Sequence, residues 1–147
     1  MEIPEMRKII WAGLKSPAEY EKAIKATSPG LGDEIFVKNY IEEIKKFVII
    51  VSLGIGTGRE LSWLEEIKNI SQIIGIDYAE SMLNFCRKIR KKFRKKLILI
   101  REDMLYPKKL EKKVKKFKKI IIYLCLENTF GNFIKKERKI FLKKLEI

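Results

Sequence analysis

The feature that most constrains this chain is an apolar run ending in three closely spaced glycines, over residues 48–60 (Val-Ile-Ile-Val-Ser-Leu-Gly-Ile-Gly-Thr-Gly-Arg-Glu). Continuous runs rich in Val and Ile are typical of strands buried in a parallel sheet. Glycine permits positive φ and lets a ligand approach the backbone closely. A segment with helical periodicity follows, from about Arg59 to Lys68, and Thr57 and Glu60 have capping-box spacing. The stretch predicts a strand, a tight turn and a helix whose N-terminus faces a nucleotide-like ligand.

The same alternation of strand and helix continues along the chain. After a first strand at 47–53, apolar strands are predicted at 73–77, 97–100 and 120–126, with helices between them and a last helix at 134–145. Uniformly apolar strands alternating with helices indicate an α/β fold, with a parallel sheet covered by helices on both faces. We predict an N-terminal helical segment over residues 1–46 and one α/β domain over 47–147.

Two helices are predicted in the N-terminal segment. Ser16 and Pro17 have the cap and first-turn chemistry of a helix start, and Thr27–Gly32 is a break. Asp33 is then expected to cap a second helix. The apolar positions expected on its buried face are Phe36, Val37, Tyr40, Ile41 and Ile44.

Carboxylates follow three of the four predicted strands, which end on one edge of the sheet. Asp77 ends the second strand, Asp103 follows the third, and Glu127 with Asn128 follows the fourth. A carboxylate at the second position accepts both hydroxyls of a ribose, and one at the third accepts from an exocyclic amine. Arginine at position 59 breaks the Gly-x-Gly-x-x-Gly fingerprint, and three acids would repel a pyrophosphate. A ligand with a ribose and an adenine but no pyrophosphate fits best.

These motifs resemble the class I S-adenosylmethionine-dependent methyltransferases, over about residues 48–133, through the segments 53–58, 75–83 and 102–104. The resemblance implies a Rossmann-like sheet of order 3-2-1-4. It also implies that the glycine loop (Gly54, Gly56, Gly58) holds the methionine part of the cofactor, and that Asp77 holds the ribose. By the same resemblance Tyr78 flanks the adenine, Asp103 and Met104 address it, and the methyl-transfer site is lined by Leu126, Glu127 and Asn128. Glu127 is the best-placed candidate for a catalytic base.

The sequence departs from that family in two respects. It has no Asn/Asp-Pro-Pro-Tyr motif after the fourth strand, so methylation of a nucleobase amine by that motif is not supported. The family has seven strands and only four are predicted here, as if the domain were truncated after the fourth. A second copy or another protein is then expected to cover the apolar edge at 120–126, because open apolar edges aggregate. An alternative function follows: a non-catalytic, methyltransferase-like subunit or remnant.

The basic charge is concentrated in the C-terminal half of the chain. The net charge is +14, and residues 87–147 carry 23 Lys and Arg against six Asp and Glu. One interpretation is a thermophile-like composition with lysines on solvated helix faces. The other is an RNA-binding module, or a methyltransferase whose acceptor is RNA. The aromatic residues within the basic runs, Phe93 and Phe117, belong to the apolar faces of their predicted helices, so they offer no stacking platform, which favours the first interpretation. The class of the acceptor stays open.

The residue inventory excludes several kinds of chemistry. There is no histidine, so a Ser-His-Asp triad, a histidine proton shuttle and a histidine zinc site are impossible, and no metal site is predicted. Two cysteines form no disulfide framework, and neither a signal peptide nor an apolar run long enough for a membrane span is present. We therefore expect a cytoplasmic protein without a membrane partner.

Overall fold

The computed structural model describes residues 16–27, 31–126, 129–130 and 133–145 of the chain. Its strands are β1 (Val48–Leu53), β2 (Ile70–Asp77), β3 (Lys96–Arg101) and β4 (Ile120–Leu124). The described helices are α2 (Pro17–Thr27), α3 (Leu31–Glu43), α4 (Leu61–Leu64), α5 (Glu80–Ile89), α6 (Lys108–Val114) and α7 (Lys135–Leu145). None of these helices is both long and apolar enough to cross a membrane.

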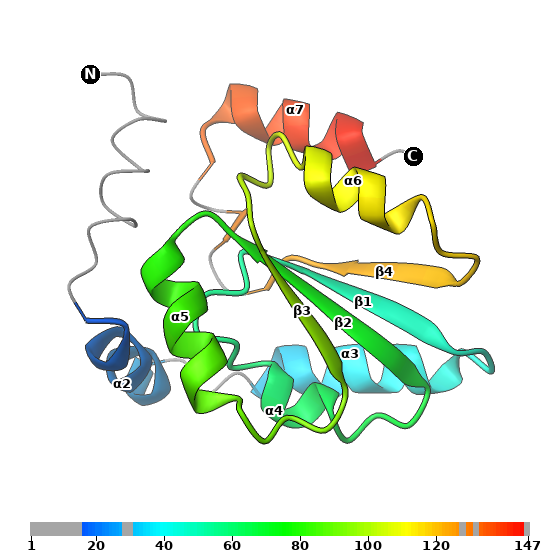
Figure 1. Cartoon of the computed structure of the whole chain (residues 1–147), viewed down its shortest axis with the longest axis horizontal. Coiled ribbons are helices and arrows are strands. Elements are labelled where there is room, and N and C mark those ends of the chain that lie inside the picture. The colour runs from blue at the N-terminus through cyan, green and yellow to red at the C-terminus, as the bar shows by residue number, and fades with distance from the viewer. Residues whose placement is uncertain (1–15, 28–30, 127–128, 131–132, 146–147) are drawn as a thin grey trace.

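The strands form one parallel sheet in the order β3-β2-β1-β4, which confirms the predicted fold class and strand order. In the centre of the sheet, Ile50 of β1 is paired with Ile73 of β2 on one side and with Ile122 of β4 on the other. Parallel strands require crossover connections, and helices supply them here. All four strands consequently end on the same edge of the sheet (Figure 1).

Two apolar layers lie on the two faces of the sheet. Val48 and Ile50 point into a cluster with residues of α3, α4 and α5, whereas Ile49 and Val51 point into a cluster with α6 and α7. Figure 1 shows these two groups of helices on opposite sides of the strands. Alternate residues of a strand face opposite sides, so every residue of β1 is buried. This explains the continuous apolar run, and each fully buried Ile stabilises the fold by about 1.5–3 kcal/mol.

The helix after the glycine loop is shorter than predicted. It begins at Leu61 rather than near Arg59 and ends at Leu64. Thr57 and Glu60 do not form the predicted capping box. The Thr57 hydroxyl donates to the carboxylate of Glu21 on α2, and Glu60 accepts from the hydroxyl of Ser52. Both side chains are thus used in tertiary contacts instead of capping the helix.

The buried face of α3 is also narrower than predicted. The helix begins at Leu31, so Asp33 lies inside its first turn rather than at the cap. Val37 and Ile41 are buried, but Phe36 is 72% exposed and Tyr40 is 53% exposed. Phe36 and Tyr40 each precede a buried position by one residue, which turns them about 100° away from the sheet. At the other helix, the Ser16 hydroxyl accepts from the N–H of Glu19, which confirms the predicted start of α2.

The fourth strand is shorter than predicted and lies at an edge of the sheet. It ends at Leu124 rather than at residue 126. Among the described residues β4 pairs only with β1, and its outer side chains Ile120 and Tyr123 are 41% and 38% exposed. The edge that the sequence predicts to need a cover is therefore partly apolar and accessible in this chain.

Candidate functional site

The glycine loop between β1 and α4 depends on three residues with positive φ. Gly54, Gly56 and Gly58 have φ of 72°, 53° and 73°, in the left-handed region that side chains disfavour. A Cβ at Gly54 would lie 2.6 Å from Thr129 Cγ2, and one at Gly58 would lie 2.6 Å from Cys86 Sγ. At Gly56 the nearest atom is 3.9 Å away. Two glycines thus serve close packing, whereas Gly56 leaves open space above the backbone.

The carboxylate of Asp77 joins this loop to the end of β2. The Gly56 N–H donates to Asp77 Oδ2 at 2.9 Å, and the Ala79 N–H donates to Oδ1 at 2.9 Å. Ala79 is the N-cap residue of α5, so Asp77 lies two residues before the cap of that helix. A carboxylate has about four lone-pair positions, so these two bonds leave acceptor capacity on both oxygens.

The electrostatics of Asp77 are those of a partly desolvated anion. Burial raises the pKa of this carboxyl above its ordinary value, and the N–H groups of Ala79, Gly56 and Tyr78 oppose the shift. Backbone N–H groups stabilise the charged form, but they compensate only part of the lost hydration. Additional hydroxyl donors would stabilise the carboxylate further. The site therefore favours a ligand that presents hydroxyl groups.

The end of β3 lies against the same loop. The Glu102 N–H donates to the carbonyl of Asp77 at 3.0 Å, and the Leu105 N–H donates to Asp103 Oδ1 at 2.9 Å. A Cβ at Gly54 would lie 3.0 Å from Met104 Cε, so Met104 reaches the glycine loop. The structure thus brings together the glycine loop and the ends of β2 and β3, which carry the predicted residues Asp77, Tyr78, Asp103 and Met104.

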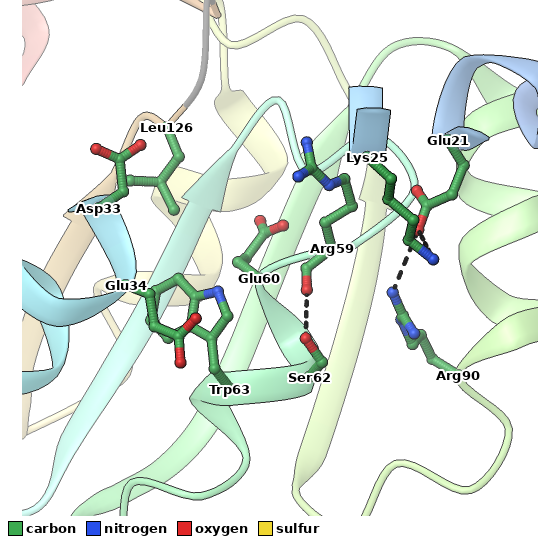
Figure 2. Close-up of a pocket in the computed structure, with 10 residues that line it drawn as sticks. All are labelled: Glu21, Lys25, Asp33, Glu34, Arg59, Glu60, Ser62, Trp63, Arg90 and Leu126. Carbon is green, nitrogen blue, oxygen red and sulfur yellow. Dashed lines mark hydrogen bonds and ion pairs between the residues drawn. The ribbon is translucent and has the colours of Figure 1, made fainter. Parts of the chain in front are cut away.

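A cavity of about 270 Å³ lies beside the C-terminal end of the glycine loop, between α2, α3, α4 and the segment after β4 (Figure 2). Among the residues that the structure describes, Leu126 is the only predicted site residue that lines it. Figure 2 shows Glu60 between one group formed by Asp33, Glu34 and Trp63 and another formed by Glu21, Lys25 and Arg90. Both signs of charge face the cavity. The lining residues are Glu21, Lys25, Asp33, Glu34, Arg59, Glu60, Ser62, Trp63, Arg90 and Leu126.

Two of these residues, Glu21 of α2 and Arg90 at the end of α5, connect their helices to the glycine loop. Neither was identified from the sequence. Arg90 Nε donates to the carbonyl of Gly58 at 3.1 Å, and Arg90 Nη2 lies 3.9 Å from Glu21 Oε1. Glu21 also accepts from Thr57 and pairs with Lys25 at 3.3 Å. No local pattern marks Glu21 among the acids of its helix. The capping-box spacing did identify Glu60, but it predicted Thr57 as the partner, whereas Glu60 accepts from Ser52.

The two cysteines, Cys86 and Cys125, contribute no nucleophile. Burial raises the pKa of the Cys86 thiol to about 12, helped by the charge of Glu60, and burial raises that of Cys125 to about 11. Neither thiol is ionised near neutral pH, and the thiolate is the reactive form. Glu127 and Asn128 lie outside the described residues. What the described site offers is acceptor groups for hydroxyls, mixed charge and open backbone, which suit binding and positioning a ligand.

No protein-family model and no curated protein matches the sequence. Several solved structures match the fold. The plantazolicin methyltransferase BamL, solved with a triazolic desmethylPZN analog and S-adenosylhomocysteine, has a TM-score of 0.62 and 17% identity, and the match covers 96% of this chain and 50% of BamL. An S-adenosylmethionine-bound amino pentose methyltransferase of calicheamicin biosynthesis from Micromonospora echinaspora has a TM-score of 0.58 and 17% identity, covering 84% and 48%.

The methyltransferase domain of the bacterial protein CtHen1 is similar to the chain at a TM-score of 0.53 and 23% identity, covering 77% of this chain and 56% of that one. At these identities the similarity establishes the fold alone, a Rossmann-like α/β fold that the chain shares with these three solved structures. The chain spans about half the length of these proteins.

Proposed function

We propose that this chain binds S-adenosylmethionine at the C-terminal ends of β1, β2 and β3 and takes part in methyl transfer. The observation that carries the proposal is the junction at Asp77. A partly buried carboxylate holds the glycine loop by the Gly56 N–H and keeps acceptor capacity on both oxygens. This junction lies in a sheet whose fold is shared with methyltransferases solved with the cofactor or its product bound.

The proposed orientation of the cofactor follows from the chemistry of each region. The ribose hydroxyls donate to Asp77, and the adenine lies among Tyr78, Asp103 and Met104. The methionine part passes over the open backbone at Gly56 toward the cavity beside α4. This part ends in an ammonium and a carboxylate, so a cavity with both Glu60 and Arg59 in its lining suits it. A neutral or uniformly charged cavity would leave one of those ions unpaired.

Methyl transfer from a sulfonium needs positioning more than it needs acid or base groups. A lone pair of the acceptor forms a bond to the methyl carbon while the carbon–sulfur bond breaks, and its electron pair neutralises the sulfur. Holding donor and acceptor in line supplies most of the acceleration, worth up to about 7–11 kcal/mol in favourable cases. Leu126, Glu127 and Asn128 are proposed to line the acceptor side, with Glu127 as the candidate base.

A second candidate function is a non-catalytic, methyltransferase-like subunit. The exposure of Ile120 and Tyr123 on the edge of β4 supports it, because a second copy or a partner that pairs with this edge would complete the sheet. Both candidates use the same Rossmann-like fold. They differ in whether the isolated chain transfers a methyl group.

Titration calorimetry with S-adenosylhomocysteine tests the binding site. Replacement of Asp77 by alanine removes an acceptor of two hydroxyls, so we expect the affinity to fall by about 1.5–3 kcal/mol, or roughly 10- to 150-fold. The matched control is Glu43→Ala, which removes an exposed carboxylate of α3 and should bind like the wild type. Absence of binding by the wild-type protein would refute the proposal. Equal affinities of the wild type and Asp77→Ala would refute the ribose assignment.

A further inference from the structure

Most of the net positive charge of this protein lies over one face of the sheet. Residues 108–119 and 135–145, which we call the α6–α7 face, contain fourteen Lys and Arg and two Glu, within a chain whose net charge is +14. Both helices pack on the same apolar layer, through Leu110 of α6 and Phe141 of α7. Figure 1 shows them side by side, away from α3, α4 and α5. Folding therefore gathers two basic segments into one surface.

The lysines of this surface differ in their pairing from the arginines of α5 and the residues that follow it. There, Arg87, Arg90 and Arg94 pair with Glu80, Glu21 and Glu65, at 3.0, 3.9 and 3.5 Å. Among the described residues, no ion pair joins a lysine of the α6–α7 face to a carboxylate. A composition adapted only to heat favours networks of ion pairs. Lysines without such partners leave a positive field suited to an anionic ligand.

The exposure of the lysines follows from the packing of α6. Leu110 is buried and Val114 and Phe117 are partly buried against the sheet, so the residues between them point outward. Lys109, Lys112, Lys115 and Lys116 are exposed, as are Lys135, Lys136, Lys139 and Lys143 on α7. Rows of exposed lysines bind a phosphodiester backbone by releasing its condensed counterions.

One end of this face lies at the edge of the sheet where the proposed cofactor site is. α6 and α7 both begin there, since each follows the C-terminal end of a parallel strand. Lys108 and Lys135 stand at these starts. Tyr106, just before α6, is 54% exposed. An exposed aromatic ring beside a row of cations offers a surface on which an unpaired base stacks.

We propose that the α6–α7 face binds the phosphodiester backbone of a single-stranded nucleic acid, with Tyr106 stacking on one of its bases. The lysines of the two helices contact the phosphates, and the strand runs from the cofactor edge along the helices. This binding goes beyond the proposed function and does not rest on it. Only the further step, that the bound strand is the methyl acceptor, would depend on cofactor binding.

Fluorescence anisotropy with labelled twenty-nucleotide oligo(U) and oligo(dT) tests the proposal on the full chain without cofactor. We expect binding at 50 mM salt, and a strand that neutralises about four phosphates should lose roughly 50-fold in affinity by 200 mM. The comparison of the two oligonucleotides shows whether the protein distinguishes RNA from DNA. Binding of either one supports the proposal, and binding of neither at 50 mM salt overturns it.

A matched pair of charge reversals tests the location. Lys112→Glu combined with Lys116→Glu changes the α6–α7 face, whereas Lys88→Glu combined with Lys91→Glu makes the same change of net charge at the end of α5 and just after it. We expect the first variant to lose at least tenfold in affinity and the second to lose less than threefold. Tyr106→Ala should lose roughly 5- to 100-fold, since one stacked base is removed.

Two results would overturn the assignment of this face. Equal losses in the two double variants would show that overall charge, rather than the α6–α7 face, attracts the strand. Tighter association with phosphatidylserine vesicles than with either oligonucleotide would show that the face binds a lipid surface instead. The affinity for S-adenosylhomocysteine is measured in the same variants, so that a loss of nucleic-acid binding can be told apart from a loss of cofactor binding. The proposal expects that affinity to stay unchanged.

Discussion

The central strand β1 and the edge strand β4 differ in burial and in the number of strands with which they pair. All six residues of β1 are buried, and its loop is tied to β2 by the Gly54 and Ile55 N–H groups, which donate to the carbonyl of Ile76 at 2.9 and 3.0 Å. β4 has one partner strand among the described residues, and Ile120 and Tyr123 are exposed on it. The comparison teaches that the elements proposed to bind the cofactor are complete within this chain. The edge of β4 is open among the described residues, and this is where we propose that a second copy or a partner pairs.

The largest expected effect compares the packing of the two regions. Ile50→Ala removes a fully buried side chain of β1, so we expect it to lower the free energy of unfolding by about 2–5 kcal/mol. Ile120→Ala in β4, where the side chain is 41% exposed, should cost less than about 1 kcal/mol. Denaturant unfolding measures both. Similar costs would mean that β4 is packed as tightly as β1 in solution, against a partner.

The next effect separates the structural glycines from the open one. Gly58→Ala adds a Cβ at 2.6 Å from Cys86 Sγ and 2.8 Å from Leu61 Cδ1, at positive φ, and should destabilise the fold by about 2–4 kcal/mol. Gly56→Ala carries only the backbone penalty of about 1–2 kcal/mol. The methyl group at Gly56 nevertheless occupies the space proposed for the cofactor. Thermal unfolding should therefore show the larger loss of stability for Gly58→Ala, and calorimetry should show the larger loss of S-adenosylhomocysteine affinity for Gly56→Ala. An unchanged affinity of Gly56→Ala would show that the cofactor does not pass over Gly56.

The pH dependence of binding tests the state of Asp77. Because burial raises the pKa of this carboxyl above 3.8, its contribution to the stability of the ligand-free protein is present below pH 3.8 and is lost as pH rises through the raised pKa. Ribose hydroxyls need the ionised acceptor, so the affinity for S-adenosylhomocysteine changes in the opposite sense. It should fall as pH drops through the raised pKa. Calorimetry on acidification checks this, with Asp77→Ala as the control that lacks the dependence.

The smallest effect on stability comes from a charge at the edge of β4. Tyr123→Lys places a charge on a side chain that is 38% exposed, so we expect the free energy of unfolding to change by less than about 0.5 kcal/mol. A charge on an edge strand blocks pairing with another strand. If copies of the chain pair through β4, light scattering after size exclusion should show a wild-type dimer and a monomeric variant. A monomeric wild type would rule out pairing between copies.

Much of the fold and the core of the candidate site follow from local sequence patterns. The uniform apolar runs identify β1 and β2 because strands buried on both faces need apolar residues at every position, and β3 and β4 have similar runs although they are only partly buried. Gly54, Gly56 and Gly58 do have the positive φ that their spacing suggested. Asp77 lies beside that loop because the chain after a parallel strand emerges at a common edge. These features depend on neighbours in sequence and on a topology with few alternatives.

Other features were decided by tertiary structure, and Thr57 and Glu60 show why. Capping a helix stabilises it by about 1 kcal/mol, whereas a hydrogen bond to a charged group contributes about 1.5–3 kcal/mol. Once folding brings Glu21 to Thr57 and Ser52 to Glu60, the tertiary partners prevail and α4 shrinks to four residues. The same holds for the cavity and for the α6–α7 face. The sequence alone determined the four strand segments and the glycine turn through local patterns, and the order of the strands was expected only from the family resemblance. Packing alone decided which distant side chains meet.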